Sequence, residues 1–166
     1  ATPGQANSLS ANKTLVIDTT VPIISSVSAN ISDGYYDIGD VMPIEVNFSE
    51  AVNVVTAGGT PTLTLETGTN DAAVNYTSGT GTNTLTFAYT VASGHTSSDL
   101  DYVATSSLAL NSGTIKDGAG NNATLTLATP GQANSLSANK TLVIDTTVPI
   151  ISSVSANISD GYYDIG

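Results

Sequence analysis

The segment NTLTFAYTV at residues 83–91 decides the fold class, because its large apolar side chains fall on every second position. MPIEVNF (42–48) and TPTLTLET (60–67) alternate in the same way. Successive side chains of a strand point to opposite faces of a sheet, so a period of two predicts strands with one buried face. The longer period of an amphipathic helix is nearly absent. The sequence therefore predicts an all-β protein.

Strand-like segments continue along the rest of the chain, rich in Val, Ile, Thr and Tyr, which suit a pleated and half-buried surface. They are VPIISSVSA (21–29), DAAVNYTS (71–78), SLALNSGTI (107–115), ATLTLA (123–128) and KTLVID (140–145). Gly- and Asn-rich segments such as KDGAGNN (116–122) lie between them and indicate turns. Seven to eight short strands at this spacing favour an Ig-like β-sandwich.

A long internal repeat sets the organisation of the chain. Residues 1–39 recur without a single change as residues 128–166, at an offset of 127 residues. Such an identity cannot arise by chance, so we expect the chain to be a window on a tandem array. Solenoid units typically span about 20–50 residues, whereas a period of 127 residues suits a self-contained domain. The sequence thus predicts domains that follow one another along a string.

Domain boundaries are expected at DTTVP, which occupies residues 18–22 and again residues 145–149. Proline restricts its own φ angle and biases the preceding residue toward an extended backbone, so this segment predicts a short, stiff hinge. On this frame residues 19–145 form one complete repeat. Residues 1–18 are then the last strand of the preceding repeat, and residues 146–166 are the first strand and loop of the next.

The charge of the chain narrows the choice of partners. A net charge of −11, with three lysines and no arginine, disfavours nucleic acid, because phosphate binding needs a basic surface. It also disfavours anionic lipid, and no apolar run is long enough for membrane insertion. Two explanations of the acidic charge stay open. One is the solubility of a long polymer, and the other is the binding of divalent cations between clustered carboxylates.

Candidate cation ligands cluster in loops and at the hinges. They are Asp18, Asp33, Asp37, Asp40, Glu50, Asp99, Asp101, Asp117, Asn121 and Asp145. Strands that run alternately up and down divide these residues between the two ends of a sandwich. One end is expected to carry Asp33, Asp37, Asp40, Asp99, Asp101 and Asp145, and the other Glu50, Asp117, Asn121 and Asp18.

In a tandem array the two ends of successive domains meet at each hinge. Oxygen ligands in that number match Ca²⁺, which takes about 6–8 of them, better than Mg²⁺, which keeps its waters. For Asp33 and Asp117 an alternative stays open, because the carboxylate of an Asp-Gly pair usually caps its own turn.

A family resemblance rests on several of these motifs taken together. They are DGYYDIGD (33–40), VNFSEAV (46–52), TPTLTLET (60–67), SDLDY (98–102), GTIKDGAGN (113–121) and KTLVIDT (140–146). In combination they resemble the bacterial Ig-like, cadherin-like tandem repeats of giant extracellular adhesins, over the whole period. The resemblance implies an extracellular extender module, often stiffened by Ca²⁺. The family's repeats are often shorter, and the extra length here lies in residues 128–139, so the path of the last strand stays open.

Enzyme activity is not expected. His95 is the only histidine, and HTSSD (95–99) holds His, Ser and Asp in one loop, which rarely orients three side chains as a catalytic triad. The absence of cysteine excludes a Cys–His zinc site. Tyr35 and Tyr36 could mark a sugar- or partner-binding spot, but we favour an aromatic pair that packs the joint between domains.

The expected function is structural: an extender or spacer repeat of a long extracellular bacterial adhesin or surface fibre, with Ca²⁺ at the hinges. Its partners are neighbouring identical repeats, and surface glycans would be bound through other domains. One alternative is a subunit of a self-assembled extracellular filament or sheath, held by strand exchange. A carbohydrate-binding module is the third, although a chain without Trp offers little aromatic platform for a sugar.

Overall fold

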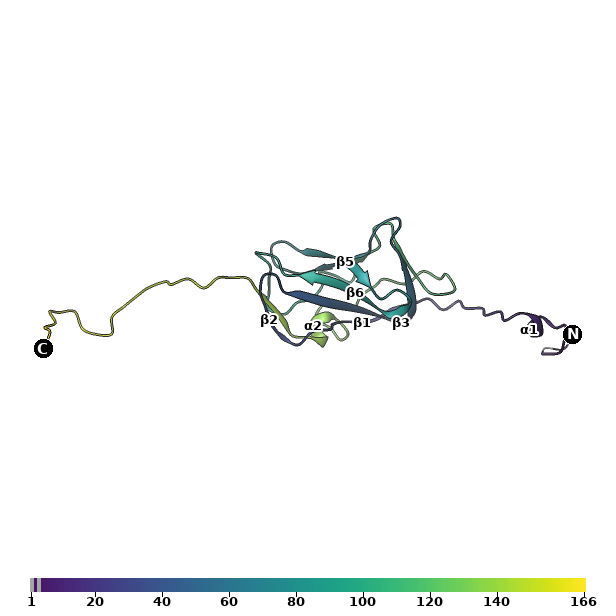
Figure 1. The fold of residues 1–166 in the computed structure, drawn as a ribbon, viewed down its shortest axis with the longest axis horizontal. Coiled ribbons are helices and arrows are strands. Elements are labelled where there is room, and N and C mark those ends of the chain that lie inside the picture. Colours follow the sequence, from purple (N-terminus) through teal and green to yellow (C-terminus); the bar gives the residue numbers. More distant parts are fainter. Residues whose placement is uncertain (1, 3) are drawn as a thin grey trace.

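The computed structural model describes residue 2 and residues 4–166, and it shows one body of strands with a long segment leaving each end (Figure 1). The strands of the body run from β1 (Ile24–Ala29) to β10 (Leu142–Asp145). The described residues contain two helices, α1 (Leu9–Asn12) and α2 (Leu136–Asn139), each of a single turn. The prediction of an all-β protein is therefore confirmed.

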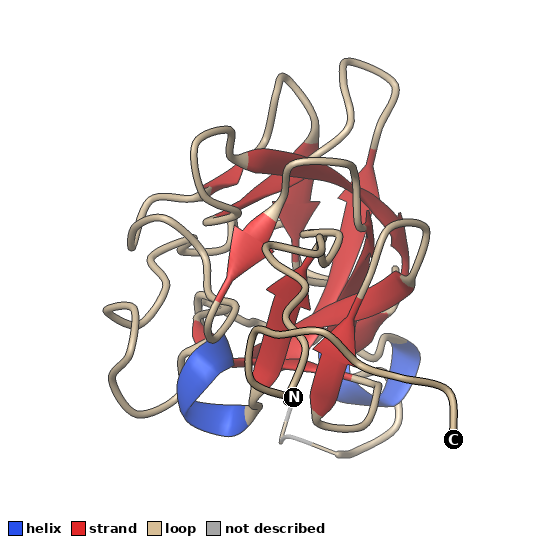
Figure 2. Cartoon of the chain, turned by 90° about the vertical axis from the view of Figure 1, so that its left-hand side faces the viewer, coloured by secondary structure: helices blue, strands red, loops and turns tan. Residues whose placement is uncertain are grey.

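The larger sheet is antiparallel, in the order β1, β3, β6, β5, β4 and β8, with β9 paired to β3. The bounds are β3 (Val41–Val55), β4 (Thr62–Leu65), β5 (Ala72–Ser78), β6 (Thr82–Thr90), β8 (Leu108–Ala109) and β9 (Thr114–Lys116). A register shift between Asn47 and Val52 interrupts β3, so that its first part pairs with β6 and its end pairs with β9. The sheet is therefore curled rather than flat (Figure 2).

A smaller sheet consists of β2 (Gly34–Tyr36), β10 and β7 (Thr96–Ser97). β10 lies in the middle, parallel to β2 and antiparallel to β7. Leu142 and Ile144 of β10 are at most 1% exposed, so this strand closes one side of the core. Because β2 and β10 run in the same direction, both strands finish at the same end of the body.

The alternating segment at residues 83–91 supplies the centre of the core. Leu85, Phe87 and Tyr89 of β6 are at most 1% exposed. They lie opposite Val46, Ile44 and Met42 of β3, all of which are fully buried. Burial of one such side chain contributes roughly 1.5–3 kcal/mol to stability. The period of two thus becomes one continuous buried face across the neighbouring strands β3 and β6.

One expected strand does not form, and the segment 107–115 divides into β8 and β9 on either side of a turn. Residues 123–128 contain no strand but a single isolated bridge, from Thr124 to Ile23. The backbone N–H of Thr124 donates to the oxygen of Pro22, whereas that of Leu127 donates to Thr105. Because neighbouring N–H groups bond to different segments, no continuous ladder can develop. The prediction of a strand at 123–128 was wrong for this reason.

The two terminal segments, residues 4–22 and 146–166, contain no strand. Residues 19–39 supply β1 and β2 to the body, but the identical residues 146–166 remain without a neighbouring strand. A strand depends on a neighbour for its hydrogen bonds, so the same sequence stays unpaired where no neighbour is present. Among the described residues, no helix has the length and apolar character needed to span a membrane.

Candidate functional site

Three carboxylates that are distant in sequence meet where the N-terminal segment joins the body. Asp18, Glu50 and Asp117 each offer one carboxylate oxygen, and these atoms all lie within 4.8 Å of one another. Asp18 belongs to the N-terminal hinge (residues 18–20), Glu50 to β3, and Asp117 to the turn after β9. In the part of the chain that the structure describes, this acidic cluster is the one group of three possible metal-ligating side chains at such distances.

Asp117 is held by the turn that it caps. Its Oδ1 accepts hydrogen bonds from the backbone N–H groups of Ala119, Gly120 and Asn121 at 2.7–2.8 Å. Its Oδ2 accepts one from Nδ2 of Asn121 at 2.7 Å. Burial acts to raise the pKa of Asp117, but these hydrogen bonds, led by the Asn121 side chain, outweigh it and lower the pKa below its ordinary value. Asp117 is therefore a charged group at neutral pH.

Glu50 has the opposite environment. It lies in the irregular stretch of β3, and its Oε1 atom is buried without a hydrogen-bond donor. Burial raises the pKa of Glu50, and the charges of Asp18 and Asp117 raise it further. A buried carboxylate oxygen without a donor is costly unless a proton or a cation compensates it. The acidic cluster therefore lacks a positive partner at Glu50.

Asn121 ties the acidic cluster to the hinge. Its Nδ2 donates to the backbone oxygens of Asp18 and Thr20, both at 3.2 Å. The Asp18 carboxylate in turn accepts a hydrogen bond from the N–H of Thr20 at 2.9 Å. The fourth residue expected at this end thus lies beside the other three, and it positions two carbonyl oxygens near them.

The donor set at this end consists of oxygen atoms on a negatively charged site. Ca²⁺ binds carboxylate and carbonyl oxygens in a flexible geometry, whereas structural Zn²⁺ sites rely on Cys and His. The unpartnered oxygen of Glu50 fits a cation, because a cation would supply the missing positive partner. Asp18, Glu50 and Asp117 are therefore the residues whose oxygen atoms could hold a metal cation.

The opposite end of the body carries the C-terminal hinge (residues 145–147). The Asp145 carboxylate accepts from the N–H of Thr147 at 2.9 Å, as Asp18 does from Thr20. The loop after β2 brings Asp37 and Asp40 to this same end, and the Asp40 carboxylate accepts from the N–H of Asp37 at 2.9 Å. These three carboxylates share an end without forming a compact group.

The remaining candidate ligands hold the segment that leads into β10. The Asp33 carboxylate accepts a hydrogen bond from the N–H of Thr141 at 3.2 Å, and the Asp99 carboxylate accepts one from the N–H of Leu142 at 3.3 Å. The Asp101 carboxylate accepts hydrogen bonds from the N–H of Gly131 at 2.9 Å and from Ser137 Oγ at 2.6 Å. Asp101 is only 8% exposed, and both of its oxygens have donors. The structure thus divides the six carboxylates expected at one end. Asp33 and Asp99 lie beside the start of β10 rather than at its finish, and Asp101 contacts Gly131 and Ser137 before that strand.

Sequence reasoning missed two residues that position the hinge and β10. Thr146 accepts a hydrogen bond at Oγ1 from the N–H of Gly94 at 3.1 Å and donates to the oxygen of His95 at 2.9 Å. Lys140 donates from Nζ to the oxygen of Ile31 at 2.6 Å and lies 3.9 Å from the Asp33 carboxylate. Thr146 recurs as Thr19 in the repeated hinge motif, and this repetition was the sequence signal that could have indicated its role.

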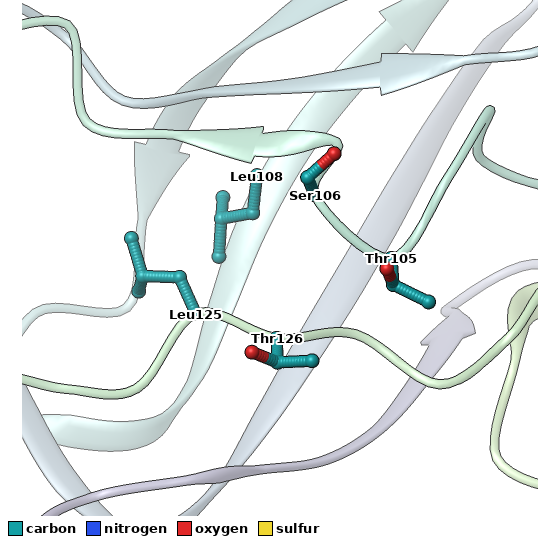
Figure 3. A pocket seen from close by; sticks show the side chains of 5 residues that line it. All are labelled: Thr105, Ser106, Leu108, Leu125 and Thr126. Carbon is teal, nitrogen blue, oxygen red and sulfur yellow. The ribbon is translucent and has the colours of Figure 1, made fainter.

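A shallow hollow beside β8 offers little chemistry. It has a volume of about 250 Å³ and is lined by Thr105, Ser106, Leu108, Leu125 and Thr126 (Figure 3). None of these five side chains ionises near neutral pH. His95, the residue considered for catalysis, instead stacks on Tyr89 with ring centroids 5.7 Å apart, and its Nδ1 is hydrogen-bonded to the Tyr89 hydroxyl at 2.8 Å.

Comparison of the chain with protein-family models, with curated proteins and with solved structures found no match.

Proposed function

We propose that the chain is part of a structural extender, in which repeats of the 127-residue period follow one another along a fibre. The observation that carries this proposal is that segments copying parts of the body leave it at opposite ends (Figure 1). Residues 1–18 have the sequence that forms α2 and β10, and residues 146–166 have the sequence that forms β1 and β2. Bodies joined through such segments make a long string, and the role of the string is mechanical rather than enzymatic.

An extracellular position on a bacterial surface fibre suits this role. The motifs that resemble adhesin repeats support that location. The net charge of −11 also suits it, because like charges oppose sideways association of identical neighbours.

Ca²⁺ at each hinge would stiffen the string. The acidic cluster places Asp18 of the hinge against Glu50 and Asp117 of the following body. Three carboxylates at this distance repel one another, which favours an open hinge until a cation lies between them. In a joined string the loop with Asp37 and Asp40 comes from the preceding repeat and could complete the ligand set.

The first test is the thermal melt of the 166-residue chain with Ca²⁺, with Mg²⁺ and with EGTA. A bound ion at about 100 times its Kd adds about 2.7 kcal/mol. For a chain of this size that shift raises the melting temperature by roughly 5–10 °C. The repeat supplies a matched control, because Asp18→Asn should abolish the shift whereas Asp145→Asn should leave it intact. Equal melts with Ca²⁺ and with EGTA would contradict the calcium proposal.

The extender role itself is tested on a two-repeat chain, which is the full chain lengthened by one further 127-residue period. Small-angle scattering should give an elongated particle that stays monomeric as its concentration rises. A compact particle, in which the two bodies fold back on each other, would contradict the role.

One observation favours a second candidate, a filament subunit that exchanges strands. Leu9, Leu15 and Ile17 are 67%, 65% and 91% exposed, although the same residues of the other copy are buried. An N-terminal segment with an unpaired apolar face could complete the sheet of another molecule. Sedimentation of the 166-residue chain separates the two candidates, since a filament subunit polymerises with rising concentration and an extender repeat does not.

A further inference from the structure

In the tandem arrangement proposed above, the two hinge copies correspond to the two sides of a single joint. Residues 18–20 are seen with the body that follows them, where Asn121 donates to the carbonyl oxygens of Asp18 and Thr20. Residues 145–147 have the same sequence and are seen with the body that precedes them, where Thr146 bonds to the loop at His95. Combining the two views gives the surroundings of a hinge that lies between two complete repeats.

Tyr35 stands on the outer face of the preceding body at this joint. The β2–β10 register places it directly opposite Val143. Leu142 and Ile144 point into the core, so Val143 and its partner Tyr35 share the outer face of the small sheet. Tyr35 is 83% exposed, so most of this large aromatic side chain lies in water in this chain.

The following body has a hollow at the matching place. Val16, the identical counterpart of Val143, lines a hollow of about 330 Å³ together with Asp18, Gly118 and Ala119. Val16 is itself 83% exposed, and nothing lies within 4 Å of the position that a Cβ on Gly118 would occupy. The residue that pairs with Val143 in one repeat therefore lies beside this hollow of the next.

We propose that Tyr35 of one repeat, beside its own Val143, packs into this hollow against Gly118 and Ala119 of the next repeat, so that successive bodies touch directly. The proposal rests on the tandem arrangement proposed above, but not on the binding of Ca²⁺. An aromatic side chain contributes a large apolar area, of about 150–250 Å², which suits an otherwise small contact.

Hydrogen bonds to the hinge hold the two bodies in register for this contact. The hydroxyl of the hinge threonine (Thr19 or Thr146) is bound by the preceding body at Gly94 and His95. The carbonyl oxygens on either side of that threonine are bound by Asn121 of the following body. Three consecutive hinge residues are thus hydrogen-bonded in turn to the following, the preceding and again the following body, which limits rotation at the joint.

The test is nitration of tyrosine by tetranitromethane in the two-repeat chain. Tyr35 then faces the joint, whereas Tyr162 belongs to the second repeat, which no complete repeat follows. Variants Tyr162→Phe and Tyr35→Phe make the peptides of the two repeats distinguishable by mass. We expect Tyr35 to react about tenfold more slowly than Tyr162, as for a joint that is closed about nine-tenths of the time. In the 166-residue chain Tyr35 should react freely.

Equal reactivity of Tyr35 and Tyr162 in the two-repeat chain would overturn the proposal. A second measurement guards against indirect effects: Gly118→Trp at its counterpart in the second repeat should fill the hollow and restore the reactivity of Tyr35. The same substitution at Gly118 of the first repeat faces no joint and should change nothing. Slow reaction of Tyr35 in EGTA would support the contact even if Ca²⁺ does not stiffen the string. A fast reaction of Tyr35 in an elongated particle would overturn the contact but would not contradict the extender role.

Discussion

The N-terminal copy (residues 1–18) and the C-terminal copy (residues 128–145) have one sequence, but the described residues of the two copies have different structures. Leu142 is fully buried in β10, whereas its counterpart Leu15 is 65% exposed. Both copies form the same helical turn, capped by the serine that precedes it. The difference shows that the capped turn depends only on nearby residues in the chain, whereas the strand forms only where β2 and β7 lie on either side of it.

Polar groups make the same point. In the N-terminal copy the N–H of Gly4 donates to Ser10 Oγ at 2.9 Å, which is a contact within the segment. In the C-terminal copy the equivalent groups of Gly131 and Ser137 both donate to the carboxylate of Asp101. The same groups therefore bond within their own segment in the N-terminal copy, whereas in the C-terminal copy they donate to a charged acceptor that is distant in sequence.

The largest expected effect is at the buried leucine of β10. Leu142→Ala should lower the free energy of unfolding by about 2–5 kcal/mol, because it removes core contacts and leaves a cavity. Leu15→Ala should change it by less than about 0.5 kcal/mol, because that side chain has no packing to lose. Urea denaturation of both variants measures the pair. A similar loss in both would mean that the N-terminal copy is packed in solution.

A second pair concerns the serine that meets Asp101. Ser137→Ala removes a hydrogen bond to a charged group and should cost about 1.5–3 kcal/mol. Ser10→Ala removes only a contact within the exposed copy and should leave the unfolding transition unmoved. The comparison uses chemical denaturation, and a neutral Ser137→Ala would show that Asp101 holds residues 128–139 through Gly131 alone.

A third, smaller contrast lies at the end of the helical turn. Asn139 Nδ2 donates to the oxygen of Val27 on β1 at 2.7 Å, whereas Asn12 Nδ2 donates to Ser8 within its own segment at 2.8 Å. Asn139→Ala should cost about 0.5–1.5 kcal/mol, and Asn12→Ala should not alter global stability. Hydrogen exchange at β1 provides the readout, since only the first variant should speed exchange there.

The smallest contrast compares how substitution of each hinge aspartate, Asp18 or Asp145, changes the pH dependence of stability. The folded-state pKa of Glu50 is raised above its ordinary value of 4.5, so the folded state binds this proton more tightly than the unfolded state. Without a metal ion, stability should therefore fall as pH rises from about that value through the raised pKa. Glu50→Gln should flatten this decline, and Asp18→Asn should lessen it.

The control is Asp145→Asn, because Asp145 has no such carboxylate neighbours and its removal should leave the pH profile unchanged. Melts in EGTA between pH 4 and pH 8 check all three variants. A Glu50→Gln profile parallel to that of the unaltered chain would show that the buried carboxylate is compensated by another group.

Much of the fold and part of the site were predictable. Alternation of apolar residues marks β4, β5 and β6 directly, because a period of two reflects which side chains are buried. The meeting of Asp18, Glu50, Asp117 and Asn121 follows from strand direction, which brings the hinge, the irregular part of β3 and the turn after β9 to one end. Whether these residues bind Ca²⁺ stays a prediction.

The placement of Asp101 could not be predicted. Its partners Gly131 and Ser137 lie in residues 128–139, where no apolar period indicates a path, and the same residues in the N-terminal copy bond to each other. The parallel pairing of β2 with β10 was equally hidden, because it joins segments at opposite ends of the domain. That pairing separates Asp33 from Asp145, although both had been expected at one end.

The sequence by itself determined whatever depends on near neighbours along the chain. Both copies have the serine-capped turn, and both hinges have the aspartate that accepts from the N–H two residues on. Only the tertiary structure decided which copy becomes a buried strand, because Leu142 and Ile144 need the apolar faces of distant strands to leave water. A single strand cannot pair its backbone N–H and C=O groups within itself and needs a neighbouring strand. Identical residues therefore form a paired strand in the C-terminal copy and remain unpaired in the N-terminal copy.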